Sequence, residues 1–162
     1  MELVYLVPVI AFLGIILGVV LNKLATEEIK FGKFGARYFV WMKRIVLISI
    51  IISVLYLADN FLIVISLAIL GFIAGVFISE YLFLGISMVL AFLFSSEVLI
   101  WMSSLVFLYG LPYGSMMRRV KKGHIYLLGL FFIPLVLLFF NIGSNFLIGF
   151  VAGGCFNYLI RK

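Results

Sequence analysis

The chain has 162 residues, of which 67% are hydrophobic and only 11% are charged, and its mean hydropathy is +1.38. Soluble domains are about half apolar, and a chain of this length forms no core large enough to hide the excess from water. Composition therefore excludes a soluble globular domain and predicts a multi-pass integral protein of the cell membrane.

Seven apolar runs follow one another along the chain, and each is a candidate membrane helix. A helix needs about 20 apolar residues to cross a bilayer, with a lower limit of about 17. Several runs are shorter than this, so six spans and re-entrant hairpins stay open as alternatives to seven spans. The runs cover residues 4–21, 45–57, 61–78, 81–94, 98–111, 125–140 and 146–160.

The positive charges favour the seven-span arrangement. With seven spans and the N-terminus outside, all 12 lysines and arginines lie on the cytoplasmic side, as the positive-inside rule requires. We therefore expect an all-α transmembrane bundle, N-out and C-in, that forms a single domain over residues 1–162. The basic segment 22–44 is expected at the cytoplasmic face, where anionic lipid headgroups rather than nucleic acid explain the net charge of +6.

Pairs of glycines four residues apart recur in four helices of the same predicted direction. Residues at i and i+4 share a helix face, and in lipid a strip of glycines lets two helix backbones approach closely. The pattern predicts GxxxG-type packing faces, an internal repeat of helix pairs, and a homo- or hetero-oligomer that uses these faces. Chance placement of small residues is the alternative. The pairs are Gly14 and Gly18, Gly71 and Gly75, Gly110 and Gly114, and Gly149 and Gly153.

A few polar residues beside the apolar runs are the candidates for a transport path. Glu80 directly follows a glycine pair, and an ionisable residue in such a place is a functional hypothesis by default. A carboxylate paired with the cytoplasmic lysines and arginines is the alternative. Asp59 and Glu97 lie at tight outer turns, either as solvated residues or as part of a path. Asn22 and Asn157 either line that path or hydrogen-bond between helices.

Nothing in the sequence predicts catalysis, a cofactor or a metal site. His124, the only histidine, has no second histidine, cysteine or acid at ligand spacing. Neither a phosphate-binding glycine loop nor a nucleophile motif is present. Two functions remain. One is a small transporter or permeation subunit for an ion or small solute; the other is a non-catalytic membrane subunit or scaffold that packs against a larger complex.

The seven-span topology predicts which turns are reachable from outside. After replacement of Cys155, single cysteines at Asn60, Ser96 and Ser144 should all react with a membrane-impermeant thiol reagent added outside. The reason is that an unpaired carboxylate costs roughly 2.5–3.5 kcal/mol at mid-membrane, which disfavours burying the acids at these turns. Protection of Asn60 and Ser96 with labelling of Ser144 would instead indicate re-entrant hairpins.

Overall fold

The computed structural model describes residues 6–24, 33–116, 129–140 and 142–161, and over these residues it contains helices and no strands. The all-α prediction is confirmed, and one helix forms in each of the seven apolar runs. The helices are α1 (Val7–Leu24), α3 (Lys33–Tyr56), α4 (Phe61–Ala74), α5 (Glu80–Phe94), α6 (Ser96–Met116), the 3₁₀ helix η2 (Ile133–Phe139) and α8 (Ser144–Ile160).

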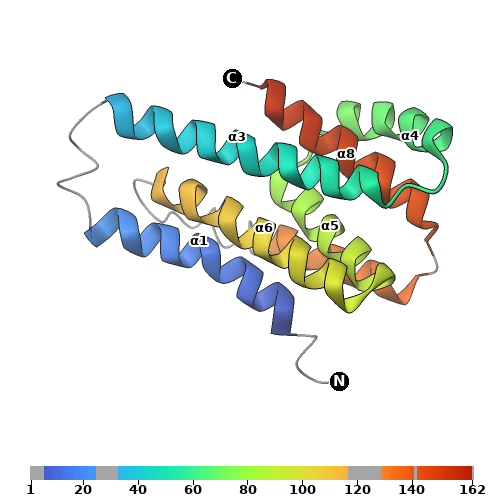
Figure 1. Ribbon diagram of the computed structural model, residues 1–162, viewed down its shortest axis with the longest axis horizontal. Coiled ribbons are helices and arrows are strands. Elements are labelled where there is room, and N and C mark those ends of the chain that lie inside the picture. The colour runs from blue at the N-terminus through green and yellow to red at the C-terminus, as the bar shows by residue number, and fades with distance from the viewer. Residues whose placement is uncertain (1–5, 25–32, 117–128, 141, 162) are drawn as a thin grey trace.

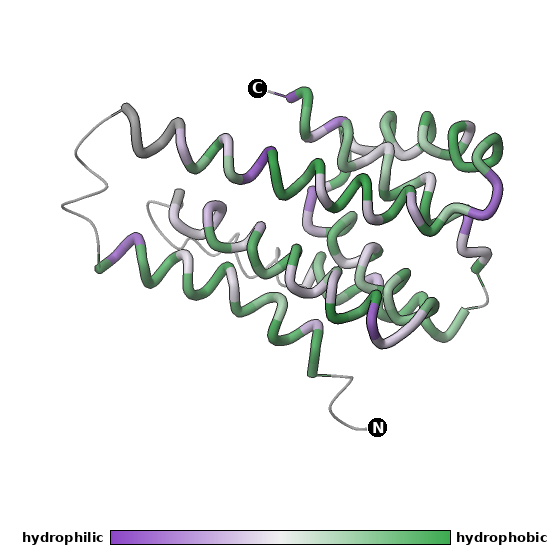
Figure 2. The backbone as a smooth tube through the Cα atoms, in the orientation of Figure 1, coloured by the Kyte–Doolittle hydropathy of each residue, from purple (hydrophilic) through white to green (hydrophobic). Residues whose placement is uncertain are grey.

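Three of the described helices are long and apolar enough to cross a membrane, over Val7–Leu24, Tyr38–Tyr56 and Ser96–Ser115. The other apolar helices have 10–17 residues. In Figure 2 the hydrophobic colour covers most of each helix, and the hydrophilic colour gathers mainly at connections and in one turn of α3. These features support a transmembrane protein. The count of seven crossings and the N-out, C-in orientation stay predictions.

Two helices extend further into the basic segments than the apolar runs indicate. α3 begins at Lys33 instead of residue 45, and α6 continues through Pro112 to Met116 instead of ending at residue 111. Hydropathy marks only the apolar part of a helix, whereas the main-chain hydrogen bonds continue through polar turns. Residues 25–32 and 117–128 of the predicted cytoplasmic loops lie outside the described residues.

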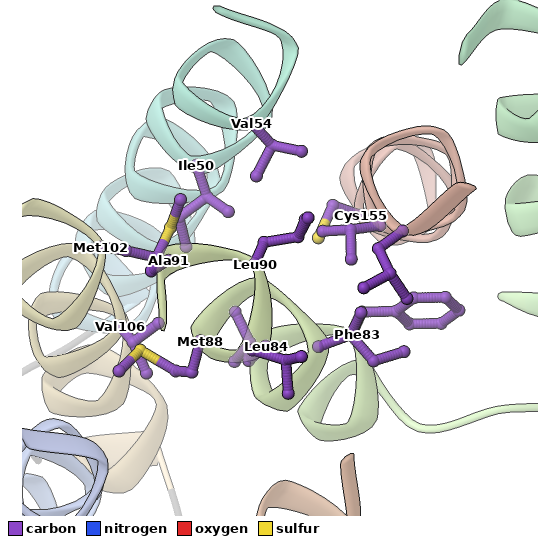
Figure 3. Packing of buried hydrophobic residues seen from close by; sticks show 14 of the residues in the cluster. Ile50, Val54, Phe83, Leu84, Met88, Leu90, Ala91, Met102, Val106 and Cys155 are labelled. Carbon is purple, nitrogen blue, oxygen red and sulfur yellow. The ribbon is translucent and has the colours of Figure 1, made fainter. Parts of the chain in front are cut away.

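The helix at the centre of the bundle is α5. Its buried residues run from Glu80 to Ala91 with one interruption, and it packs against α6, α8 and η2. Figure 3 shows Leu84, Met88 and Leu90 of α5 meeting side chains of the surrounding helices, among them Ile50, Val106 and Cys155.

In chain order α4 and α5 form a hairpin whose arms hardly contact each other, since α8 packs against both of them. Each arm is short for a bilayer. The arms have 14 and 15 residues, which correspond to about 21–22 Å at 1.5 Å per residue. The hydrocarbon core of a bilayer is roughly 30 Å thick. Consecutive helices alternate in direction, and the α3–α4 and α5–α6 connections lie at the same end of the bundle (Figure 1). The connection between α4 and α5 points away from that end of the bundle.

The closest backbone contacts join two pairs of parallel helices, α1 with α6 and α4 with α8. A Cβ atom at Gly110 would lie 2.6 Å from the backbone nitrogen of Ile15, and one at Gly149 would lie 2.6 Å from the carbonyl oxygen of Val64. At each of the glycines in the four sequence pairs, an added Cβ would come within 3.0 Å of an atom of the facing helix. In both helix pairs, these glycines therefore lie between helices of the same chain.

Substitution of a contact glycine should disrupt the bundle. At Gly153 a Cβ would overlap the backbone of Ala68, so Gly153→Leu should lower stability by about 3 kcal/mol or more. At Gly75 the nearest atom is the Asn157 Cβ, 2.9 Å away, and Gly75→Leu should act in the same direction to a smaller degree. Thermal unfolding of the purified protein in detergent measures both effects.

The matched control for these substitutions is Gly129→Leu, because among the described residues no other helix has an atom within 4 Å of a Cβ at Gly129. This variant should unfold within a few degrees of the wild type. Equal stability of the Gly129→Leu and Gly153→Leu variants would contradict the role of close backbone contact.

Candidate functional site

The turn of the α4–α5 hairpin places a carboxylate inside the protein. Glu80 is the first residue of α5, and it follows the N-cap Ser79, whose side chain accepts a hydrogen bond from the backbone N–H of Tyr81 at 3.4 Å. The positive end of a helix dipole favours a carboxylate at this position. The residue is only 9% exposed, and glutamate is almost never buried to this degree unless it is paired.

Lys43 of α3 supplies the compensating charge. Its Nζ lies 2.8 Å from Oε2 and 3.0 Å from Oε1 of Glu80, so it contacts both carboxylate oxygens. Lys43 stands in the middle of α3 and within the candidate span Tyr38–Tyr56. The ion pair therefore joins the hairpin turn to the side of a long helix rather than to its end.

Two tyrosines of α6 complete the surroundings of this pair. The hydroxyl of Tyr109 donates a hydrogen bond to Glu80 Oε2 at 2.5 Å. The Lys43 ammonium lies 5.3 Å from the ring centroid of Tyr109 and 5.0 Å from that of Tyr113, distances at which an aromatic face attracts a cation. Lys43 is thus held by a carboxylate and by two aromatic rings.

A third tyrosine in this cluster has an unusual hydroxyl. Tyr81 is 0% exposed, and its ring packs edge-on against Tyr113 with 5.0 Å between the centroids. Its hydroxyl is buried and makes no hydrogen bond of normal geometry in the described part of the chain, although it lies close enough to Tyr113 to interact with that side chain. Unpartnered buried hydroxyls are uncommon in native proteins and call for a specific explanation.

On the other side, α8 holds the hairpin turn in place. The Asn157 side-chain amide donates a hydrogen bond to the carbonyl oxygen of Phe72 at 3.0 Å, and the hydroxyl of Tyr158 donates one to the carbonyl oxygen of Ile78. Phe72 lies in the last turn of α4, where carbonyls lack partners within their own helix. Asn157 therefore forms a hydrogen bond between helices next to Glu80.

The remaining sequence candidates lie elsewhere in the bundle. Asp59 and Glu97 are exposed near the α3–α4 and α5–α6 connections. The backbone N–H of Asp59 donates a hydrogen bond to Asn145 Oδ1 at 3.3 Å. Asn22 lies in the last turn of α1. The structure thus brings Glu80 and Asn157 to the same hairpin turn and places the two other acids at the opposite end of the helices.

Sequence reasoning allowed a lysine or arginine beside Glu80 as one alternative, as Lys43 provides, but it missed the tyrosines that surround the pair. Tyr109 and Tyr113 are spaced i, i+4 and each precedes a glycine, so the tyrosines are rotated by about 100° from the glycine face. Because of this offset, one face of α6 contacts α1 through the glycines, and another face contacts Lys43 through the tyrosines. The repeated Tyr-Gly was the available signal, but Pro112 made the segment resemble a loop.

His124 lies outside the described residues. Among the residues that the structure describes, no group of three histidine, cysteine, aspartate or glutamate side chains is arranged to hold a metal ion.

No family model matches the chain, and comparisons with curated proteins and with solved structures found no significant similarity.

Removal of Lys43 should destabilise the protein through the carboxylate that it leaves behind. We expect Lys43→Gln to lower the free energy of unfolding by about 3 kcal/mol, as for other broken buried pairs. The double variant Lys43→Gln/Glu80→Gln should recover most of this loss, because no charge is left unpaired. Arg44→Gln, at the next position of α3, is the matched control. Thermal unfolding in detergent measures all four proteins, and equal stability of the single and double variants would refute charge balance by Lys43.

Proposed function

We propose that the protein is a small membrane transporter for an ion or small solute, with Glu80 as its proton- or cation-binding group. The observation that supports this proposal is the Lys43–Glu80 ion pair at the turn of a hairpin whose arms are shorter than a bilayer core. Transporters commonly bind substrates and coupling ions at the ends of broken or short helices inside the membrane. This similarity is one of architecture alone. The role of Glu80 as a binding group is supported by the chemistry of the site.

The chemistry of the cluster allows Glu80 to change partners. If the carboxylate takes up a proton or a cation, Lys43 loses an ionic partner but keeps the faces of Tyr109 and Tyr113, which still attract its charge. The buried hydroxyl of Tyr81, which makes no hydrogen bond of normal geometry to a described residue, offers a donor and an acceptor position to an incoming group. After a proton or cation binds to Glu80, each charged group of the cluster therefore still has an interaction partner.

Glu80 and its hydrogen bond from Tyr109 also connect two units of the bundle. One unit is the pair α1 and α6, and the other is the pair α4 and α8, each joined through close contacts at its glycines. We infer that these contacts are GxxxG-type packing faces that keep each pair together as a unit. Glu80 belongs to the hairpin that α8 holds, whereas Tyr109 belongs to α6. A change at Glu80 would loosen one unit from the other, and such movement underlies alternating access.

A non-catalytic membrane subunit is the second candidate, and one observation favours it. An apolar groove of about 470 Å³ lies between α3, α4 and α8 on the outside of the bundle, with Ala68, Phe72 and Gly153 in its lining. In this function a helix of a partner protein would pack into the groove, and the Lys43–Glu80 pair would only stabilise the fold.

Flux through reconstituted protein separates the two functions. Liposomes that contain the full chain and an internal pH-sensitive dye are made acidic inside, and Na⁺, K⁺ or choline is added outside. We expect at least one cation to speed the loss of the pH gradient in wild-type liposomes. Glu80→Gln should reduce the rate to that of protein-free liposomes, because glutamine neither ionises nor takes up a proton.

Two variants keep this experiment decisive. The Lys43→Gln/Glu80→Gln protein leaves no unpaired charge, so it should be folded and yet inactive. Asp59→Asn, an exposed carboxylate near the other end of the helices, should transport at the wild-type rate. Wild-type rates in the folded double variant, or no flux above protein-free liposomes with any of the three cations, would overturn the transport proposal.

A further inference from the structure

A second site lies at the end of the bundle where α3 ends and α6 begins. It is a pocket of about 390 Å³ formed between these helices. Its polar and aromatic lining comes from Ser53 and Tyr56 of α3 and from Glu97 and Trp101 of α6, and Met102 contributes to its apolar part. None of these residues belongs to the Lys43–Glu80 cluster.

The charge of this pocket is negative. Glu97 is exposed, and no described lysine, arginine or histidine forms an ion pair with it. None of the described residues that line the pocket is basic. A carboxylate in such surroundings favours a cation as its partner.

The aromatic residues define which kind of cation fits. Glu97 and Trp101 are spaced i, i+4 and share one face of α6, and Tyr56 faces the same pocket from α3. Both rings are open to a ligand, since Tyr56 is 88% exposed and Trp101 is 73% exposed. Aromatic faces next to a carboxylate are the means by which proteins recognise substituted ammonium groups.

The apolar part of the pocket argues against a metal ion. Met102 is 1% exposed and forms a buried apolar wall, which suits methyl or methylene groups. Calcium needs six to eight oxygen ligands, and magnesium needs an octahedral oxygen shell, whereas the lining offers one carboxylate and two kinds of hydroxyl. A hydrated metal ion would make no direct contact with the faces of the aromatic rings.

We propose that this pocket binds an organic ammonium ion, with Glu97 contacting the charge and with Tyr56 and Trp101 contacting the substituents on nitrogen. This inference goes beyond the proposed transport function and does not require it. A lipid headgroup and a free soluble amine share this chemistry. Because tyrosine and tryptophan gather at membrane–water interfaces, both sources have access to the pocket.

Equilibrium binding of radiolabelled choline tests the site without any transport. With the purified full chain in maltoside detergent, which contains no ammonium group, we expect saturable binding that tetramethylammonium displaces. Glu97→Gln should weaken binding roughly tenfold by removing the charge contact. Trp101→Leu should weaken it to a similar degree, whereas Trp101→Phe should retain most of the affinity because an aromatic face is kept. Asp59→Asn should bind choline as the wild type does.

Reconstitution identifies the natural source of the ammonium group. If a lipid headgroup occupies the pocket, choline should bind in phosphatidylglycerol vesicles and lose its site in phosphatidylcholine vesicles. If a soluble amine is the ligand, choline should bind in both. Absence of saturable binding in detergent and in both vesicles, or unchanged affinity in Glu97→Gln, would overturn the proposal and leave Tyr56 and Trp101 as interface anchors.

Discussion

The arrangement of the bundle depends on one electrostatic constraint, which is that a buried carboxylate must keep a cation beside it. Glu80 is 9% exposed and begins the central helix α5. Lys43 meets it from α3, and Tyr109 meets it from α6. Charge pairing at this point therefore constrains the rotation of α3 and the depth of the hairpin turn, and the hydrogen bond from Tyr109 constrains the rotation of α6. A shift of α3 or α5 by a turn would break the ion pair, and a shift of α6 would break the hydrogen bond from Tyr109, since one turn moves a side chain by about 5.4 Å.

Close approach of the helix backbones makes this arrangement possible. Apolar side chains gain little from association in lipid, so membrane helices are held by tight packing and by hydrogen bonds between helices. Gly14 and Gly18 bring α1 onto α6, and Gly71 brings α4 onto α8. The hydrogen bond from Asn157 to the end of α4 adds to the second pair. Helix α6 thus contacts α1 through its glycine face and Glu80 through Tyr109 on another face, and α4 leads directly into the turn that carries Glu80.

The two ends of the bundle differ in chemistry, and the apolar core separates them. At one end, Lys43 and Glu80 are enclosed by tyrosines; at the other, the Glu97 carboxylate stands in an open pocket. Between them, Ile50, Met102 and Val106 pack together in the interior (Figure 3). A close-packed apolar layer excludes water, so communication between the ends would require the helices to move apart.

The sequence by itself determined that a helix forms in each apolar run; it also predicted a membrane protein and named Glu80 among the candidate site residues. These features follow from hydropathy and from local spacing, which act within one segment. Only the tertiary structure decided that Lys43, 37 residues away, and Tyr109, 29 residues away, are the partners of Glu80. It also decided that α6 continues through Pro112. Contacts between helices depend on the rotation and register of each helix against its neighbours, and no pattern within a single segment specifies either.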